Sequence, residues 1–496
     1  MRTSLCLACW LIGTSTMAVA PLVRHKSPVP TAEAEWFAQS LYDIVDQVSR
    51  LYIRADQPDA PDAVSENELC EAALEGLYEA AGLPIPGSLA ARVRSAQQPV
   101  ELRALIRSTR LALGNREVLR YSGALRVAML AMTRALDDAS TVVPGQDVAR
   151  SGYNEVNQGL GLEVSLDGRP VTIRTVLPGG PAQRAGLSPG DRILRINGLD
   201  PESAARAIAG RVVLTVQRGS AGEQRTVALD ARTFRPETVL GVARNSDNVW
   251  EYWVDRESRI AHVRIASLAQ GTADELAAAL GQLRECGLSA LVLDLRWCPG
   301  GVPDQIAAVV RLFLSKGVIM VLKDHDELRT ARATEPAPFA DLPMVVLVNH
   351  ETTGGAEFIA AALQDNKRAL VAGERTRGKA TLQRLIPLPV ENSYLKVTSG
   401  LLVRPSGKNL QRLANSKLWE DWGVQPSTGL EFRLSAELAR ALKEQWLRQT
   451  LRPGGAREAL ALDDAASDPQ RQAAVRALRE KLKRREAAPT RAAALP

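Results

Sequence analysis

Apolar residues recur at spacings of three and four from residue 31 to about residue 143. Such spacing places them on one face of an α-helix. The first run has Thr31 as a candidate N-cap, and its apolar face carries Phe37, Leu41, Ile44, Val45, Val48, Leu51 and Tyr52. Residues 66–81, 100–113 and 117–136 have the same pattern. The pattern predicts a helical N-terminal domain over residues 31–145.

Between residues 159 and 230 the pattern changes to short β-branched runs separated by glycine and proline. Val171-Thr172-Ile173 and residues 212–216 are typical of strands. We therefore expect a separate β-rich domain over residues 155–232.

From residue 259 onward, apolar strands alternate with helices. Alternation of this kind indicates a largely parallel sheet with right-handed crossovers, buried on both faces. The expected strands are residues 260–265, 290–295, 344–348 and 369–371, and the expected helices are residues 272–285, 304–314 and 357–364. Sites in such sheets lie beyond the carboxyl ends of the strands, which directs attention to the loops after Leu295, Val348 and Val371. We assign this α/β core to residues 239–432.

The two ends of the chain differ from this globular part. Residues 1–20 combine Arg2, an apolar stretch and the exit Ala18-Val19-Ala20, which is typical of a secretory signal peptide. We expect export to the periplasm or cell envelope, with an uncleaved anchor as the alternative because Pro21 disfavours cleavage. Residues 433–496 are expected to form a C-terminal tail, either a solvated helix opened by Asp468-Pro469 or a disordered segment.

Composition excludes several classes of function. Lys and Arg number 62 against 56 Asp and Glu, a mild excess that, without interleaved aromatic residues, does not favour nucleic-acid binding. Outside the expected signal the cysteines are Cys70, Cys286 and Cys298, which form neither a disulfide framework nor a zinc motif. The four histidines are scattered, so we expect no metal and no other cofactor.

The β-rich segment resembles a PDZ domain of exported bacterial proteases. The resemblance rests on Gly159-Leu160-Gly161-Leu162, on Gly180-Pro181-Ala182 with Gly186-Leu187, and on residues 189–198. Consecutive backbone N–H groups of the Gly-Leu-Gly-Leu turn can hold a terminal carboxylate, and the following strand edge can accept a peptide as an added strand. The resemblance implies that Gly159, Leu160, Gly161 and Leu162 bind protein or peptide C-termini.

The remainder resembles the carboxyl-terminal processing (tail-specific) protease family, whose core is ClpP/crotonase-like. The landmarks are Leu136-Asp137-Asp138-Ala139-Ser140, residues 293–301, 349–357 and 361–365, Gly373, Gly378-Lys379, Gln383, residues 405–407 and 423–426. The family uses a serine nucleophile and a neutral lysine as general base, because desolvation lowers the lysine pKa. The resemblance implies that Lys379 is the base, Gln383 orients it, and Gly300, Gly301 and Gly355 form the oxyanion hole.

The nucleophile departs from the family pattern. Counting back three residues from Glu357 places Gly354 in the serine slot, and residues 316–388 contain no serine. Thr353 is a possible substitute nucleophile one residue away, whereas His350 and Cys298 are weaker alternatives. Cys298 also replaces the family's asparagine beside the Pro-Gly-Gly loop.

Three functions remain open. The chain is an endopeptidase for exported proteins, a non-catalytic peptide-binding scaffold or regulator, or a carrier of small apolar ligands on the same fold. Hydrolysis by the unaltered protein separates the first from the other two.

Overall fold

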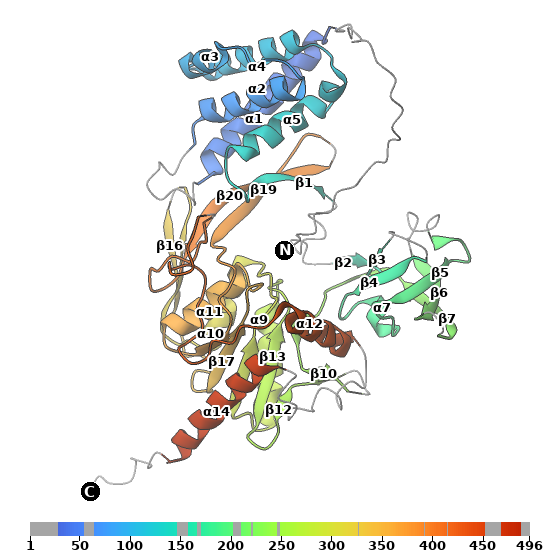
Figure 1. Ribbon diagram of the computed structural model, residues 1–496, viewed down its shortest axis with the longest axis vertical. Coiled ribbons are helices and arrows are strands. Elements are labelled where there is room, and N and C mark those ends of the chain that lie inside the picture. Colours follow the sequence, from blue (N-terminus) through green and yellow to red (C-terminus); the bar gives the residue numbers. More distant parts are fainter. Residues whose placement is uncertain are drawn as a thin grey trace. The chain divides into compact units, whose positions relative to one another are not determined.

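The computed structural model describes residues 28–53, 64–145, 157–165, 170–201, 210–219, 222–245, 249–325, 327–390, 392–413, 415–451 and 468–487. The chain divides into two compact units, Met1–Val45 with Glu66–Met132 and Asp46–Ser65 with Thr133–Pro496 (Figure 1). The expected signal at residues 1–20 lies outside the described residues. Among the described helices, none has both the length and the apolar character needed to cross a membrane.

The first unit is helical, as the apolar spacing predicts. Its elements are α1 (Thr31–Leu51), α2 (Glu66–Ala80), α3 (Leu89–Ser95), α4 (Pro99–Leu113), the 3-10 turn η1 (Glu117–Leu119) and α5 (Gly123–Arg134). Leu41, Val45 and Leu74 are fully buried. The spacing of these side chains therefore identifies the packed faces correctly.

The end of the expected helical stretch is a strand instead. Residues Thr141–Pro144 form β1, which pairs antiparallel with β20 (Ser393–Val403). The β-branched Thr141, Val142 and Val143 favour a strand where a partner edge is available. The helical part therefore ends with α5 at Arg134, and the division between the two units falls in the last turn of that helix, between Met132 and Thr133.

The β-rich segment forms a five-stranded antiparallel sheet in the order β3-β4-β5-β6-β7. The strands are β3 (Leu162–Ser165), β4 (Thr172–Val176), β5 (Asp191–Ile196), β6 (Arg211–Arg218) and β7 (Gln224–Asp230), with α7 (Pro181–Arg184) between β4 and β5. A separate ribbon pairs β2 (Asn157–Gly159) with β8 (Arg232–Phe234). Among the described strands, β3 is an edge of its sheet.

The α/β core contains a six-stranded mixed sheet. Four strands are parallel neighbours, in the order β13 (Ile260–Ile265), β14 (Ala290–Asp294), β17 (Met344–Val348) and β18 (Leu370–Gly373). Strands β12 (Trp253–Asp255) and β9 (Val239–Leu240) pair antiparallel with β13. A short hairpin joins β10 (Ala243–Arg244) to β11 (Trp250–Glu251). The expected parallel sheet is confirmed, with antiparallel additions.

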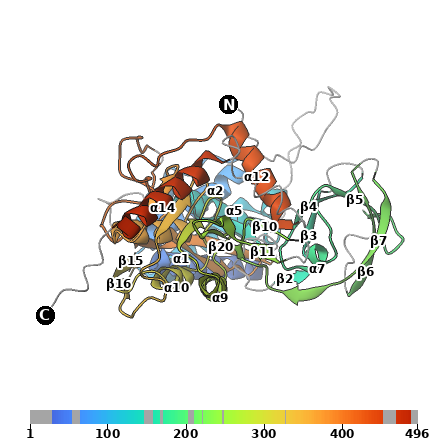
Figure 2. The ribbon, with the colours of Figure 1, turned by 90° about the horizontal axis from the view of Figure 1, so that it is seen from below.

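Helices cover both faces of this sheet. Leu291 and Leu293 of β14 pack with α9 (Thr272–Glu285), α10 (Pro303–Arg311) and α11 (Gly355–Asp365), whereas Val292 packs with α14 (Pro469–Ala487). Figure 2 shows α9 and α10 on one side and α14 on the other. Successive strand residues point to opposite faces, so an all-apolar strand is the sequence signature of this burial.

A second, antiparallel sheet supports the loop after β18. It consists of β1, β20, β15 (Gly317–Lys323) and β16 (Leu328–Ala333) in that order, with β19 (Thr381–Pro387) also paired to β20. Residues 374–380 connect β18 of the core sheet to β19 of this one. The segment that carries Lys379 is therefore anchored at both ends.

The C-terminal region packs on the core, contrary to the expected solvated tail. It contains α12 (Ala436–Leu451) and α14. Ala474, Val475 and Leu478 of α14 are buried against the sheet, and Asp468 pairs with Arg296 at 2.9 Å. The expectation failed because small apolar residues at helical spacing suffice to cover a sheet, even in a segment rich in charges.

Candidate active site

Three loops meet at the carboxyl edge of the parallel strands, as the topology predicts. The loop after β14 contacts the loop after β17 through the Trp297 backbone N–H, which donates to Asn349 Oδ1 at 3.0 Å. The loop after β17 contacts the loop after β18 where the Arg377 N–H donates to the Thr352 carbonyl at 3.0 Å. The sheet thus assembles segments that are distant in sequence.

Gly354 occupies a tight turn between β17 and α11. Its φ is +57° and ψ is −126°, a conformation that a residue with a side chain adopts only with strain. A Cβ atom placed on Gly354 would lie 3.7 Å from the Pro299 carbonyl oxygen, its nearest contact. The slot therefore has room for a side chain but carries none.

The Pro-Gly-Gly loop approaches this slot closely. Gly300 has φ +80°, and a Cβ atom on it would lie 2.7 Å from the Gly355 nitrogen and 2.8 Å from the Thr353 carbonyl oxygen. The Gly301 position is equally crowded, with the Leu268 carbonyl oxygen 2.1 Å from a Cβ atom there. The structure therefore brings Gly300 and Gly355 together beside Gly354, and their oxyanion role stays a prediction.

Glu357 connects the turn that contains Gly354 to the loop that contains Lys379. This carboxylate has no exposed surface. Its Oε2 accepts the backbone N–H of Gly354 at 2.9 Å and that of Lys379 at 2.9 Å. Its Oε1 accepts the Gly378 N–H at 2.7 Å and the Thr376 hydroxyl. Burial raises the pKa of Glu357 to about 7, although the four donors favour the carboxylate.

Lys379 is half-buried beside the Glu357 carboxylate. Burial lowers the pKa of its ammonium, and the nearby charges of Lys396 and Arg377 lower it further. A lowered pKa is what a lysine general base requires. Gln383 donates from Nε2 to Thr381 Oγ1 at 2.8 Å, and among the described residues it makes no hydrogen bond to Lys379. Its orienting role stays a prediction.

The three alternative nucleophiles lie in unfavourable surroundings. Thr353 Oγ1 is buried and has no hydrogen-bond partner among the described atoms. Cys298 is fully buried, and this burial raises the pKa of its thiol to about 12 despite a hydrogen bond from the Gly300 backbone. His350 is exposed and binds Glu374 at 2.8 Å, which raises the pKa of the imidazole. None of the three presents an activated atom in the turn.

The Gly-Leu-Gly-Leu turn lies between β2 and the edge strand β3. The Leu160 and Gly161 carbonyls accept the N–H groups of Ala182 and Leu177, both at 2.9 Å. Gly161 has φ +72°, and a Cβ atom on it would lie 3.0 Å from the Phe234 ring. Hydrogen bonds to its carbonyl groups thus hold the turn in place. Peptide binding by Gly159, Leu160, Gly161 and Leu162 stays a prediction.

Two features of the site escaped the sequence analysis. Glu357 served there only as a landmark, although a lone acid at the start of an otherwise apolar helix is itself a signal. Asn349 is the second: its Oδ1 accepts N–H groups from Trp297, Glu351 and Thr352. Among the described residues, no cluster of three or more His, Cys, Asp or Glu side chains could hold a metal ion.

Comparisons with known proteins agree with this geometry. The sequence profile of peptidase family S41 matches residues 259–426, and that of the PDZ domain matches residues 153–225. The carboxyl-terminal-processing protease of Picosynechococcus sp. is 30% identical over 51% of this chain and 62% of that protein. The carboxy-terminal processing protease CtpA of Bacillus subtilis is 29% identical over 52% of this chain and 55% of that protein.

The matches thus span less than two thirds of these two relatives' lengths. Among solved structures, the photosystem II D1 C-terminal processing protease is 23% identical, with 74% of this chain and 94% of that chain covered and a TM-score of 0.40. A likeness of that size carries no argument of its own. The sequence matches show a segment similar to peptidase family S41 over residues 259–426 and a segment similar to a PDZ domain over residues 153–225, and both relatives named above are carboxyl-terminal processing proteases.

Proposed function

We propose that this chain is a peptide-binding member of the carboxyl-terminal processing protease family that lacks Ser-Lys turnover. The observation that carries the proposal is Gly354, which occupies the nucleophile turn with no side chain. Loss of a serine nucleophile costs on the order of 10⁶ in turnover, or about 8 kcal/mol of barrier. The remaining parts of the site can still hold a peptide.

Peptide recognition is assigned to the PDZ domain. Its β3 is an edge strand among the described strands, and the preceding Gly159–Leu162 turn has N–H groups suited to a carboxylate. The names of the relatives describe processing of carboxyl termini. We infer that this chain binds the same end of a polypeptide, and that its partners are exported proteins because residues 1–20 are typical of a signal peptide.

The test is a protease assay on the unaltered protein and three variants, with an unstructured substrate of defined C-terminus. We expect no hydrolysis by the unaltered protein and a gain of hydrolysis in Gly354→Ser. Gly354→Ala is the matched control, because it introduces the same backbone strain without a hydroxyl. Gly354→Ser combined with Lys379→Ala should lose the gain. Robust hydrolysis by the unaltered protein that disappears in Lys379→Ala would refute the proposal.

Thr353 supports a second candidate, slow hydrolysis by the unaltered protein. Its hydroxyl, in the turn next to the slot, has no hydrogen-bond partner in the described part of the chain, so a change of the Gly354-Gly355 backbone could present it to Lys379. A one-residue displacement moves a side chain by more than productive geometry tolerates, so any such activity is weak. Thr353→Val removes the hydroxyl at nearly constant shape, and Thr352→Val is its neighbouring control. Loss of residual hydrolysis in the first variant alone would establish Thr353 as the nucleophile.

A further inference from the structure

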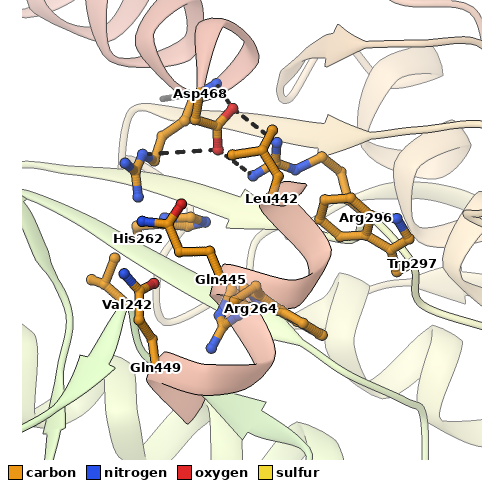
Figure 3. A pocket seen from close by; sticks show the side chains of 11 residues that line it. Val242, His262, Arg264, Arg296, Trp297, Leu442, Gln445, Gln449 and Asp468 are labelled. Carbon is orange, nitrogen blue, oxygen red and sulfur yellow. Dashed lines mark hydrogen bonds and ion pairs between the residues drawn. The ribbon is translucent and has the colours of Figure 1, made fainter. Parts of the chain in front are cut away.

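A cavity on the α14 side of the core sheet carries polar atoms that the proposed function does not use. It is lined by side chains of β13, the loop after β14, α12 and α14 (Figure 3). His262 and Arg264 alternate along β13 with Ala261, Val263 and Ile265, which face the opposite helices. The cavity volume is about 30 Å³, enough for two or three water-sized groups at about 10–15 Å³ each.

Arg264 is a buried guanidinium that has no counter-ion among the described residues. It is 1% exposed, donates from Nε to the Gly241 carbonyl at 2.7 Å and from one terminal nitrogen to Thr450 Oγ1 at 2.8 Å. It stacks 4.1 Å over the Trp446 ring. Its other terminal nitrogen has no hydrogen-bond partner, and no carboxylate of the described residues is within ion-pair distance. Burying an unpaired charge costs free energy, and an anion bound at this position would offset that cost.

A second arginine, on the separate β10–β11 ribbon, shows the contrast. Arg244 is also buried and stacks 3.9 Å over the Trp250 ring. Unlike Arg264, it pairs with the carboxylate of Glu237. Both guanidiniums are thus buried, stack on a tryptophan and donate to a backbone carbonyl, but among the described residues only Arg244 has a carboxylate partner.

Within the described part of the chain, three further polar atoms around the cavity also have no hydrogen-bond partner: His262 Nδ1, Trp446 Nε1 and Arg471 Nε. The cluster has an excess of positive charge. Arg296 and Arg471 pair with Asp294 and Asp468, so among the described residues these two carboxylates stand against three arginines, Arg264 included. His262 adds no charge, because burial lowers the pKa of its imidazole while its Nε2 contacts Asp294 at 2.9 Å.

We propose that this cavity binds a small monovalent anion, either a halide or the carboxylate of a short acid. Arg264 and Trp446 donate hydrogen bonds to the anion. The anion neutralises the charge of the Arg264 guanidinium, which a water molecule does not do. His262 Nδ1, an acceptor in the tautomer that donates to Asp294, binds a water molecule that shares the cavity. The volume excludes nucleotides and sugar phosphates.

Thermal unfolding in a chloride-free buffer tests the proposal, with sodium chloride and sodium formate as the two probes and gluconate as the ionic-strength control. Because only the folded state has the cavity, we expect a saturable rise in Tm of about 5 °C with at least one probe. A rise with chloride alone identifies a halide site, and a rise with formate alone identifies a carboxylate site. Equal effects of gluconate, or no saturable effect of either probe, overturn the proposal.

Variants locate the site. Arg264→Met should abolish the anion-dependent rise, whereas the matched Arg244→Met should keep it. If Arg264→Met does not fold, Trp446→Phe retains the aromatic ring beneath the guanidinium and removes only the N–H donor. We expect Trp446→Phe to lower the affinity for the anion about tenfold, because one hydrogen bond to a charged group is lost. If chloride raises the Tm, crystals soaked in bromide should show an anomalous peak beside Arg264; if only formate does, crystals soaked in formate should show formate there, and a cavity filled by water alone in the matching soak refutes the assignment.

Discussion

The backbone nitrogen of Lys379 lies 2.9 Å from Glu357 Oε2, the same oxygen that accepts the backbone N–H of Gly354 at 2.9 Å. One buried carboxylate therefore fixes both halves of the expected dyad through their main chains. This arrangement does not depend on the side chain at position 354, which explains how the rest of the site can persist around a glycine.

The raised pKa of Glu357 predicts that the stability of the protein depends on pH. Its pKa of about 7 in the folded state exceeds the ordinary value of 4.5, so folding favours the protonated form. The stabilisation, about 3 kcal/mol in size, is full below pH 4.5 and disappears as pH rises through 7. Urea unfolding of the unaltered protein and Glu357→Gln between pH 5 and 8 measures it. The difference between the two should change over that interval, and a constant difference would contradict the raised pKa.

Replacing Lys379 by methionine should stabilise the protein. Burial disfavours the charged ammonium in the folded state, so Lys379→Met removes this desolvation cost. The gain is largest at low pH, where the ammonium is forced to stay charged, and it vanishes as pH rises toward 10.5. Lys396→Met serves as the control on the neighbouring strand. Tm measured across pH for both variants checks this, and destabilisation by Lys379→Met at neutral pH would contradict it.

The glycines at positions 300 and 354 should respond differently to alanine. Both have positive φ, which costs an L-residue about 1–2 kcal/mol. Only at Gly300 would the new Cβ atom lie within 3 Å of main-chain atoms, those of Gly355 and Thr353. We expect Gly300→Ala to cost at least about 2 kcal/mol more than Gly354→Ala. Equilibrium denaturation of the two variants provides the comparison, and equal losses would mean that the Pro-Gly-Gly loop can move away from the turn.

The pair Arg296 and Asp468 should couple the C-terminal helix to the core. The guanidinium donates to both carboxylate oxygens, at 3.0 and 2.9 Å, and both side chains are buried. Asp468→Asn leaves Arg296 with one carboxylate fewer and should cost about 3 kcal/mol. The double variant with Arg296→Met should cost less than the two single losses combined. Additive losses in this cycle would show that the pair does not interact in solution.

The sequence by itself determined the elements and their order. Continuous apolar runs placed β13, β14 and β17, and apolar residues spaced by three and four placed α9 and α11, close to their observed bounds, because burial on a sheet or helix face leaves a local pattern. It also determined which motifs are present, and the glycine in place of the serine is visible without any coordinates.

Local patterns were insufficient where a partner comes from far along the chain. The helix of the tail was expected, but not its burial, because Asp468 finds Arg296 across 172 positions. Strand β1 was missed because its pairing edge, β20, lies outside its own segment.

Only the tertiary structure decided which polar atoms are satisfied. It gave Glu357 four donors from two loops and, within the described residues, left Thr353 Oγ1 buried without a partner and Arg264 without the carboxylate that Arg244 has. A residue's type records what it can donate or accept. Whether it is paired or unpaired depends on the side chains that packing brings beside it, and this pairing decides both the state of the candidate active site and the proposed anion site.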